Sequence, residues 1–237
     1  MDITFSKKLQ NKLLNAVNKK HTDLILIDGI SCSGKTFFSD ALNSFLKNKG
    51  KKTHLVSKDL FLKSRKQRIS YLKKIKKKIC YLQNSKHYYQ NKIKYFINCF
   101  NEEDKKIIIK NLYSRKTGLN NDTQKFHLNY KNILIYEGIY CLDDFEKINR
   151  KKIKILILRN IYSCLSSKIK RIRDKKISIY DVVLEFTNIH LNSFYRYIKK
   201  NNYDLVIDYK NNSFELMQNS QKNYIQKITN FLTMHRS

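Results

Sequence analysis

The sequence between positions 24 and 36 contains the residue types that bind a polyphosphate. Gly29, Gly34, Lys35 and Thr36 stand there in the spacing G-x-x-x-x-G-K-[ST]. Glycines allow the backbone to wrap closely around phosphates with its N–H groups pointing inward. Lys35 would reach the β- and γ-phosphates of a nucleoside triphosphate, and the Thr36 hydroxyl would hold Mg²⁺. We therefore predict a phosphate-binding loop of the Walker A type formed by Gly29, Ile30, Ser31, Cys32, Ser33, Gly34, Lys35, Thr36 and Phe37.

The segments on either side of this loop are the elements that must hold it in place. Four apolar residues, 24–27, precede it as a short buried strand, and a helical pattern follows it to about Asn48, where Gly50 ends the helix. This helix would direct the positive end of its dipole toward the phosphates. The alternative is a glycine-rich turn without a ligand, but the strand before it and the helix after it favour a binding site.

Two acidic residues follow other predicted strands. Asp59 comes after the strand of residues 53–57, and Glu137 ends the buried strand of residues 133–136. Ligands of open α/β sheets bind outside the carboxyl ends of the strands, so both acids should face the phosphate loop. Asp59 could take the proton from an attacking hydroxyl, and Glu137 could order hydrated Mg²⁺ with Thr36. The alternatives are a helix-capping Asp59 and a plain turn at Glu137.

A basic segment follows the strand predicted at residues 153–158. Residues 166–176 carry cations on a helical pattern, among them Arg171 and Arg173. On a mobile segment, such cations could close over the triphosphate and neutralise charge in the transition state. The alternative is a basic helix that is simply exposed to solvent.

Composition and element order predict one domain over residues 1–237. The chain is 41% hydrophobic, enough for a sizeable core, and its five glycines and absent prolines mark no linker. Strands that alternate with helices imply a three-layer α/β fold, a parallel sheet with helices on both faces. We expect residues 60–125 to form an acceptor-side insertion, helical to about Asn111, and residues 160–180 to form a lid. The other expected elements are an outer helix at 3–19, strands at 107–110, 153–158 and 203–208, and a C-terminal helix with Leu216, Ile225, Ile228 and Phe231 inward.

The formal charge of +30 invites a nucleic-acid interpretation. However, 40 of the 49 basic residues are lysines, and the chain is also rich in Asn, Ile and Tyr, which favours a general coding bias over a dedicated groove. The field should attract anionic ligands in either case. Five scattered cysteines without a C-x-x-C pair indicate reduced thiols, and no apolar run approaches the ~20 residues that span a bilayer. We expect a cytoplasmic protein without membrane contact.

Several segments, in the same order, resemble the uridine kinase and phosphoribulokinase family of P-loop kinases. They are the loop of residues 26–36, the Val-Ser-Lys-Asp-Leu-Phe stretch at 56–61, the Ile-Tyr-Glu-Gly-Ile stretch at 135–139, the Lys-Arg-Ile-Arg-Asp stretch at 170–174 and the Tyr-Asp-Leu-Val-Ile stretch at 203–207. The resemblance implies a P-loop NTPase fold and these site residues: Asp59 as general base, Lys35 on the phosphates, Thr36 and Glu137 at Mg²⁺, Arg171 and Arg173 in the lid, and Tyr113 and Arg115 with Asp59 at the acceptor.

The acceptor side departs from the family pattern. Where uridine kinases have a D-H-P segment that grips the ribose, this chain has Ser-Lys-His-Tyr-Tyr at 85–89, and no His follows Tyr113. We expect a kinase that uses ATP or GTP with Mg²⁺ and phosphorylates a hydroxyl of a small molecule, a nucleoside such as uridine first. The alternatives are a polynucleotide-end kinase or other nucleic-acid-binding NTPase, and a nucleotide-binding protein that has lost catalysis.

Overall fold

The computed structural model describes most of the chain, namely residues 5–19, 22–76, 81–82, 84–102, 104–129, 131–171, 177–211, 213–217 and 220–234. The helices are α1 Lys7–Lys19, α2 Lys35–Asn48, η1 Lys58–Phe61 (3-10), α3 Arg65–Ile75, α4 Asn84–His87, α5 Gln90–Asn101, α6 Cys141–Asp144, α7 Ile161–Lys170, α8 Ile179–Glu185, η2 Phe186–Leu191 (π-helical), α9 Asn192–Lys200 and α10 Ser220–Met234. The strands are β1 Leu24–Asp28, β2 Thr53–Ser57, β3 Lys105–Tyr113, β4 Asn120–Leu128, β5 Ile133–Glu137, β6 Lys152–Leu158, β7 Leu205–Lys210 and β8 Ser213–Leu216.

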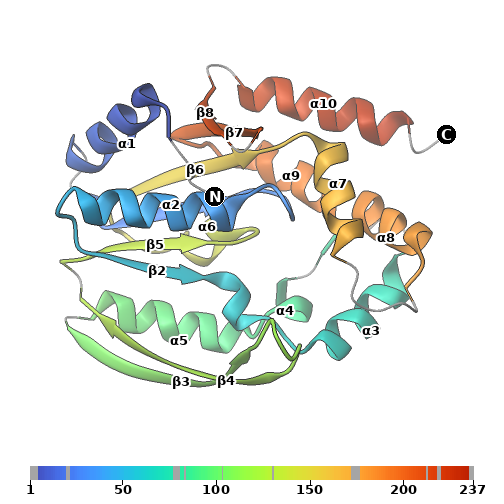
Figure 1. The fold of residues 1–237 in the computed structure, drawn as a ribbon. Helices are drawn as coiled ribbons and strands as arrows, with labels where there is room; N and C mark the ends of the chain where they lie inside the picture. Colours follow the sequence, from blue (N-terminus) through green and yellow to red (C-terminus); the bar gives the residue numbers. More distant parts are fainter. Residues whose placement is uncertain are drawn as a thin grey trace.

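The main sheet has six strands in the order β2-β5-β1-β6-β7-β8 (Figure 1). All neighbours are parallel except the pair β7 and β8. Because β1 lies between β5 and β6, and β2 pairs with β5, the carboxyl ends of the first, second and fifth strands meet at one edge. Glu137 stands opposite both Ile27 and Ser57 in this register, so the predicted parallel α/β sheet is confirmed.

Alternate residues of the central strands pack on opposite faces of the sheet. On one face, Ile25 and Ile27 contact apolar residues of α1 and α2, including Leu13 and Phe38. On the other face, Leu24 and Leu26 belong to a larger core with α5, α9 and α10. Period-two alternation of buried side chains is what a sheet covered on both faces requires. The expected three-layer arrangement therefore follows from the apolar residues that precede the terminal acids of β1 and β5 and make up most of β6.

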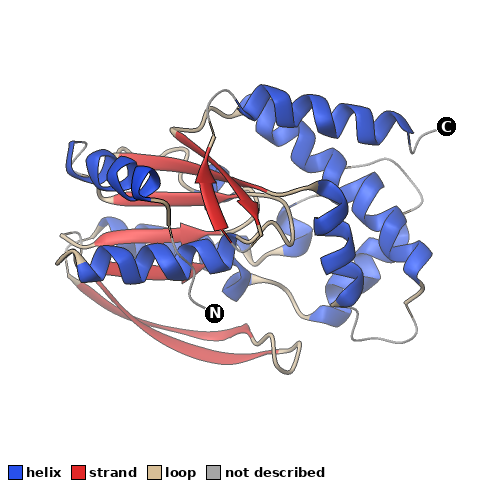
Figure 2. Cartoon of the chain, turned by 45° about the horizontal axis from the view of Figure 1, so that its top comes forward, coloured by secondary structure: helices blue, strands red, loops and turns tan. Residues whose placement is uncertain are grey.

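Strands β3 and β4 form a separate antiparallel hairpin below the main sheet (Figure 2). The sequence predicted a strand only at 107–110 and a helical segment up to about Asn111. These boundaries are wrong, because helix α5 ends at Asn101 and strand β3 continues to Tyr113. Half-buried and exposed residues alternate along β4, which is typical of a strand with one face toward solvent. The polar side chains of this strand conceal the alternation in the sequence.

The C-terminal region also differs from the expectation. After β7 the chain turns back into the antiparallel strand β8, which was not predicted. Leu216 lies in β8 rather than in the last helix. Helix α10 buries Ile228 and Phe231 as expected. The basic segment predicted at 166–176 begins within α7, and Arg171 caps that helix, whereas Arg173 lies outside the described residues.

The helices and the cysteines bear on the expected cytoplasmic location and reduced thiols. Within the described ranges, no helix combines the length and apolar character needed to cross a membrane. Four cysteines are free thiols, three of them buried and Cys32 half-buried, while Cys80 lies outside the described residues. The cytoplasmic location stays a prediction.

Candidate active site

The phosphate loop curls around Lys35 at the carboxyl end of β1. The Lys35 ammonium donates a hydrogen bond to the Ile30 carbonyl at 2.9 Å, and the residue is only 8% exposed. Gly34 has a φ of 97°, and a methyl group there would lie 2.9 Å from Cδ1 of Tyr209. Cys32 is also left-handed, with a φ of 65°. A left-handed residue within such a loop is typical of backbone nests that bind anions.

Asp28, the last residue of β1, fastens the start of this loop to the neighbouring strand end. Its carboxylate accepts hydrogen bonds from the backbone N–H groups of Gly29 at 2.7 Å and of Tyr140 and Cys141 at 3.1 Å. Full burial raises the pKa of Asp28, and the bond from Gly29 opposes that rise. Asp28 could not be singled out from the sequence, because an acid at a strand end gives no sign of the three backbone donors around it.

Glu137 lies beside Thr36, as predicted. Its Oε1 atom accepts hydrogen bonds from the Ser57 hydroxyl at 2.5 Å and from the Thr36 hydroxyl at 3.4 Å. The residue is 3% exposed, and burial, followed by the neighbouring charge of Asp59, raises its pKa, while Lys35 opposes the rise. No lysine or arginine of the described residues lies within ion-pair distance of this carboxylate. A buried carboxylate beside two hydroxyls is a donor set suited to Mg²⁺, which binds through few protein oxygens and keeps water and phosphate ligands.

Asp59 lies in η1, directly beyond the end of β2. Ser57 caps this short helix by accepting the Asp59 N–H, so the alternative that Asp59 itself is the capping residue is wrong. The Asp59 carboxylate is one-third exposed and accepts a hydrogen bond from Nη2 of Arg115 at 2.7 Å. Arg115 lies at the tip of the β3–β4 hairpin, so this hairpin reaches the strand-end edge of the main sheet at this residue. Asp59 also acts electrostatically on Glu137.

Lys58, next to Asp59, points into the core. It is fully buried, its ammonium lies 2.8 Å from Oδ2 of Asp144 and donates to the Tyr140 carbonyl at 3.0 Å, and it sits 4.8 Å from the Tyr88 ring centroid. Gly138 makes room for it, since a methyl group there would lie 2.5 Å from Cβ of Lys58. The sequence analysis missed this anchor, because one lysine among 40 carries no sign of burial.

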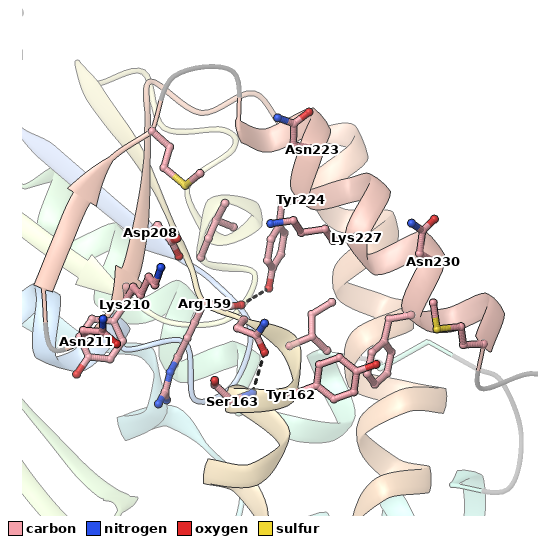
Figure 3. Close-up of a pocket in the computed structure, with 17 residues that line it drawn as sticks. Arg159, Tyr162, Ser163, Asp208, Lys210, Asn211, Asn223, Tyr224, Lys227 and Asn230 are labelled. Atoms are coloured by element: carbon pink, nitrogen blue, oxygen red, sulfur yellow. Dashed lines mark hydrogen bonds between the residues drawn. The ribbon is translucent and has the colours of Figure 1, made fainter.

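A cavity of about 770 Å³ opens beside the phosphate loop, between α7, β7 and α10 (Figure 3). Arg159, at the end of β6, lines it, donates to the Cys32 carbonyl at 3.0 Å and stacks on the Tyr209 ring. The Tyr224 hydroxyl donates to the Arg159 carbonyl at 3.0 Å, as Figure 3 shows. Asp208, with a pKa raised by burial, also lines this cavity. Neither Arg159 nor Tyr209 was expected from the sequence.

A smaller hollow of about 280 Å³ adjoins the large cavity, since Arg159 and Tyr209 line both. Its walls also include Cys32, Gly34 and Phe37 of the loop and Arg171, so the structure brings the predicted Arg171 to the phosphate loop. The Phe37 side chain is 52% exposed.

Tyr113 ends β3 and is only 6% exposed. The Arg68 guanidinium carbon lies 4.8 Å from the centroid of its ring. The ring is thus buried and has a cation on one face. The sequence analysis did not assign Arg68 to the site, because nothing in the helical pattern of α3 connects it with a residue 45 positions later.

The fold and the strand-end site define an α/β nucleotide-binding domain of the P-loop kinase class. Residues 24–213 match the family model described as Phosphoribulokinase / Uridine kinase family, and the chain belongs to this family. A comparison with curated protein sequences found no match.

Solved structures share the fold at low sequence identity. A protein described as a fructose transport system kinase from Silicibacter sp. TM1040 matches with a TM-score of 0.56 and 14% identity, covering 85% of this chain and 98% of that one. A possible uridine kinase from Bacillus stearothermophilus matches with a TM-score of 0.55 and 14% identity over 84% and 98%. A D-glycerate 3-kinase from Cryptococcus neoformans var. grubii matches with a TM-score of 0.54 and 9% identity over 89% and 98%.

Proposed function

We propose that this kinase transfers the γ-phosphate of ATP or GTP to a hydroxyl group of a small molecule, with Asp59 as general base. The observation that carries this proposal is the shared edge of the sheet. There the phosphate loop with Lys35 faces Glu137 and Thr36 on one side and Asp59 on another. In this arrangement, Lys35, Thr36 and Glu137 would bind the donor nucleotide, and the separate Asp59 carboxylate would contact the acceptor hydroxyl.

The donor nucleotide has a natural orientation in this geometry. With its phosphates on the loop, its base would enter the large cavity beside Arg159 and Tyr209, which adjoins the loop (Figure 3). Arg171 borders the same hollow as Cys32 and Gly34, so it could contact the phosphates from the opposite side. We keep residues 160–180 as a proposed lid and residues 60–125 as the proposed acceptor-side insertion of one catalytic domain.

The reaction needs one proton acceptor and compensation of negative charge. The acceptor oxygen attacks the γ-phosphorus, the bond from that phosphorus to the β-phosphate oxygen breaks, the nucleoside diphosphate leaves, and the hydroxyl proton passes to Asp59. Arg115 contacts Oδ2 of Asp59, which leaves Oδ1 to accept that proton. Lys35 would neutralise charge on the β- and γ-phosphates.

Thr36 and Glu137 would hold a hydrated Mg²⁺ ion beside the phosphates. The metal ion supplies charge neutralisation of the β- and γ-phosphate oxygens when bound. The short contact between Ser57 and Glu137 fixes the carboxylate orientation, so Ser57 is a positioning residue for the same site.

A transfer assay tests this function directly. The purified protein is incubated with Mg²⁺ and γ-labelled ATP or GTP and with nucleosides, sugars, hydroxy acids and sugar phosphates, uridine and cytidine being the acceptors that the family resemblance indicates. We expect label transfer to at least one hydroxyl compound, and loss of transfer in the Lys35→Met variant. A protein that binds no nucleotide, or binds it and phosphorylates no member of the panel, would contradict the proposal.

A further inference from the structure

Arg68 presents a partly unsatisfied guanidinium on the acceptor side of Asp59. Its Nε donates to the Lys63 carbonyl at 2.9 Å, and its Cζ lies 4.8 Å from the Tyr113 ring centroid. These two contacts fix the plane of the group, which is half-buried. Neither Nη nitrogen makes a hydrogen bond or ion pair to a residue that the structure describes. Four of the five donors of this guanidinium therefore have no partner among the described residues and could bind a ligand.

Arg65 lies one helical turn before Arg68 and faces the same side of α3, because residues three apart are neighbours on a helix. Its backbone N–H donates to the Gly118 carbonyl at 2.8 Å, and a methyl group on Gly118 would lie 2.8 Å from its Cζ atom. This glycine, with a φ of 76°, thus lets the hairpin tip approach the guanidinium. No carboxylate within the described part of the chain pairs with Arg65 or Arg68.

The carboxylates of this region already have cationic partners. Asp59 accepts from Arg115, and Glu185 contacts Lys168 at 2.7 Å and His190 at 2.9 Å. Burial alone would raise the pKa of Glu185, but Lys168 and His190 outweigh it and hold that pKa below its usual range. Neither acid is therefore free to compensate the two arginines of α3.

Three aromatic side chains close to Asp59 in the described part of the chain offer no open face to a nucleobase. Phe61, Tyr88 and Tyr113 are 0%, 2% and 6% exposed. The Lys58 ammonium covers Tyr88 as the Arg68 guanidinium covers Tyr113. A base that stacks on an aromatic ring needs an accessible π-face. This wall therefore suits an anion better than a neutral nucleoside.

We propose that the acceptor is a small anion, a hydroxy acid or a phosphate monoester of a polyol. Its carboxylate or phosphate is bound by Arg65 and Arg68 while its hydroxyl lies at Asp59. This inference rests on the proposed kinase function and names the class of its acceptor. A planar guanidinium donates two parallel hydrogen bonds to either anionic group, so both sources share the same recognition chemistry. The acceptor hydroxyl gives its proton to Asp59 as the new bond to the γ-phosphorus forms.

Matched pairs of acceptors test the charge requirement. Release of nucleoside diphosphate is measured with ATP and Mg²⁺ for glycerate against glycerol and for ribose 5-phosphate against ribose, with uridine and cytidine as neutral nucleosides. We expect kcat/KM for one anionic member to exceed that of its neutral counterpart and of both nucleosides by about 100-fold or more, as for one to two charge-assisted hydrogen bonds. Preference for glycerate identifies a carboxylate, and preference for ribose 5-phosphate identifies a phosphate.

Equal or better turnover of a nucleoside would overturn the anionic acceptor and leave the kinase function intact. If none of these compounds is phosphorylated, binding decides: melting temperatures are measured with each anion beside a non-hydrolysable ATP analogue and Mg²⁺. A stabilisation by either anion that glycerol and ribose lack supports the inference, and its absence overturns it. Failure of the nucleotide analogue itself to stabilise the protein would instead count against the proposed kinase function.

Substitution of Arg68 connects the preference to this side chain. Arg68→Met should raise KM for the preferred anion about 10- to 100-fold while ATP affinity and turnover of the neutral counterpart stay unchanged. Arg68→Lys, which keeps the charge but loses the planar fork, should fall between the two. Lys66→Met, an exposed change on the same helix, is the matched control. An equal loss for the anion and its neutral counterpart, or an unchanged KM, would contradict the assignment.

Discussion

The two halves of the active site differ in how firmly they are built. On the donor side, Asp28, Lys35 and Glu137 are all buried, and each is held in place by hydrogen bonds with backbone or hydroxyl groups. On the acceptor side, Asp59 and Arg115 are one-third and more than one-half exposed, and they join segments 56 positions apart through one ion pair. Exposed ion pairs are weak and exchange partners readily. We therefore expect the proposed donor half to be preorganised and the proposed acceptor half to rearrange more easily when substrate binds.

The largest expected effect concerns the residue at the boundary of the two halves. Asp59→Asn removes the proton acceptor but keeps the shape, so kcat should fall about 10²- to 10⁴-fold, the usual contribution of a general base. Nucleotide affinity should stay unchanged, because Asp59 belongs to the acceptor half. Steady-state kinetics and calorimetric titration with a non-hydrolysable nucleotide measure the two quantities.

The control for this change is Asp104→Asn, an exposed acid at the far end of the β3–β4 hairpin. It should leave both quantities unchanged. Unaltered turnover in Asp59→Asn would remove Asp59 from its proposed role and erase the functional distinction between the halves.

A second large effect is expected beneath the site, in the buried pair of Lys58 and Asp144. Lys58→Met leaves the Asp144 carboxylate buried without its cation, which costs about 3–5 kcal/mol in the free energy of unfolding when one partner of a buried pair is removed. The double variant Lys58→Met/Asp144→Asn should recover part of that loss, because no uncompensated charge stays buried. Chemical denaturation measures both. Equal stability of the single variant and wild type would show that η1 is not anchored from below.

This contrast also explains how much of the molecule could be predicted from the sequence. The phosphate loop and Glu137 follow short apolar strands, and local pattern and strand order suffice to bring them together. Lys58 and Arg68 could not be recognised, because their roles depend on Asp144 and Tyr113, which reach them only through tertiary packing.

The hairpin was missed for a related reason. Its strands pair with each other and stay outside the main sheet, so β4 has the alternating polar pattern of a half-exposed strand instead of a continuous apolar run. Hence the donor half, built from buried parallel strands, was predicted well, and the acceptor half was predicted only as an insertion of unspecified shape.

A smaller effect should appear as pH falls. Burial and the charge of Asp59 raise the pKa of Glu137 above the ordinary 4.5, so this carboxylate protonates at a higher pH than a solvated one would. A protonated carboxyl is a poor ligand for Mg²⁺. We therefore expect KM for Mg·ATP to rise with falling pH in wild type, and the Glu137→Gln variant to have a high KM that changes little with pH.

The raised pKa of Glu137 also affects the stability of the folded protein. Because the folded state prefers the neutral acid, ionised Glu137 destabilises the nucleotide-free protein at neutral pH, and this penalty disappears as pH falls through the raised pKa. Glu137→Gln should consequently melt at the same or a higher temperature than wild type at neutral pH without nucleotide. A clearly lower melting temperature would mean that Glu137 holds the fold together more than it binds a metal.

The smallest change in stability is expected for Arg115 at the hairpin tip. Its size tests whether the acceptor half is held together more weakly than the donor half. Arg115→Met removes an exposed partner of Asp59, so the free energy of unfolding should change by no more than about 1 kcal/mol. A double-mutant cycle with Asp59→Asn should give a coupling energy within the same limit, whereas the cycle of Lys58→Met and Asp144→Asn should give a coupling several times larger. A strong coupling between Asp59 and Arg115 would mean that the acceptor half is as rigid as the donor half. Arg115 would then be a fixed part of the wall that orients Asp59.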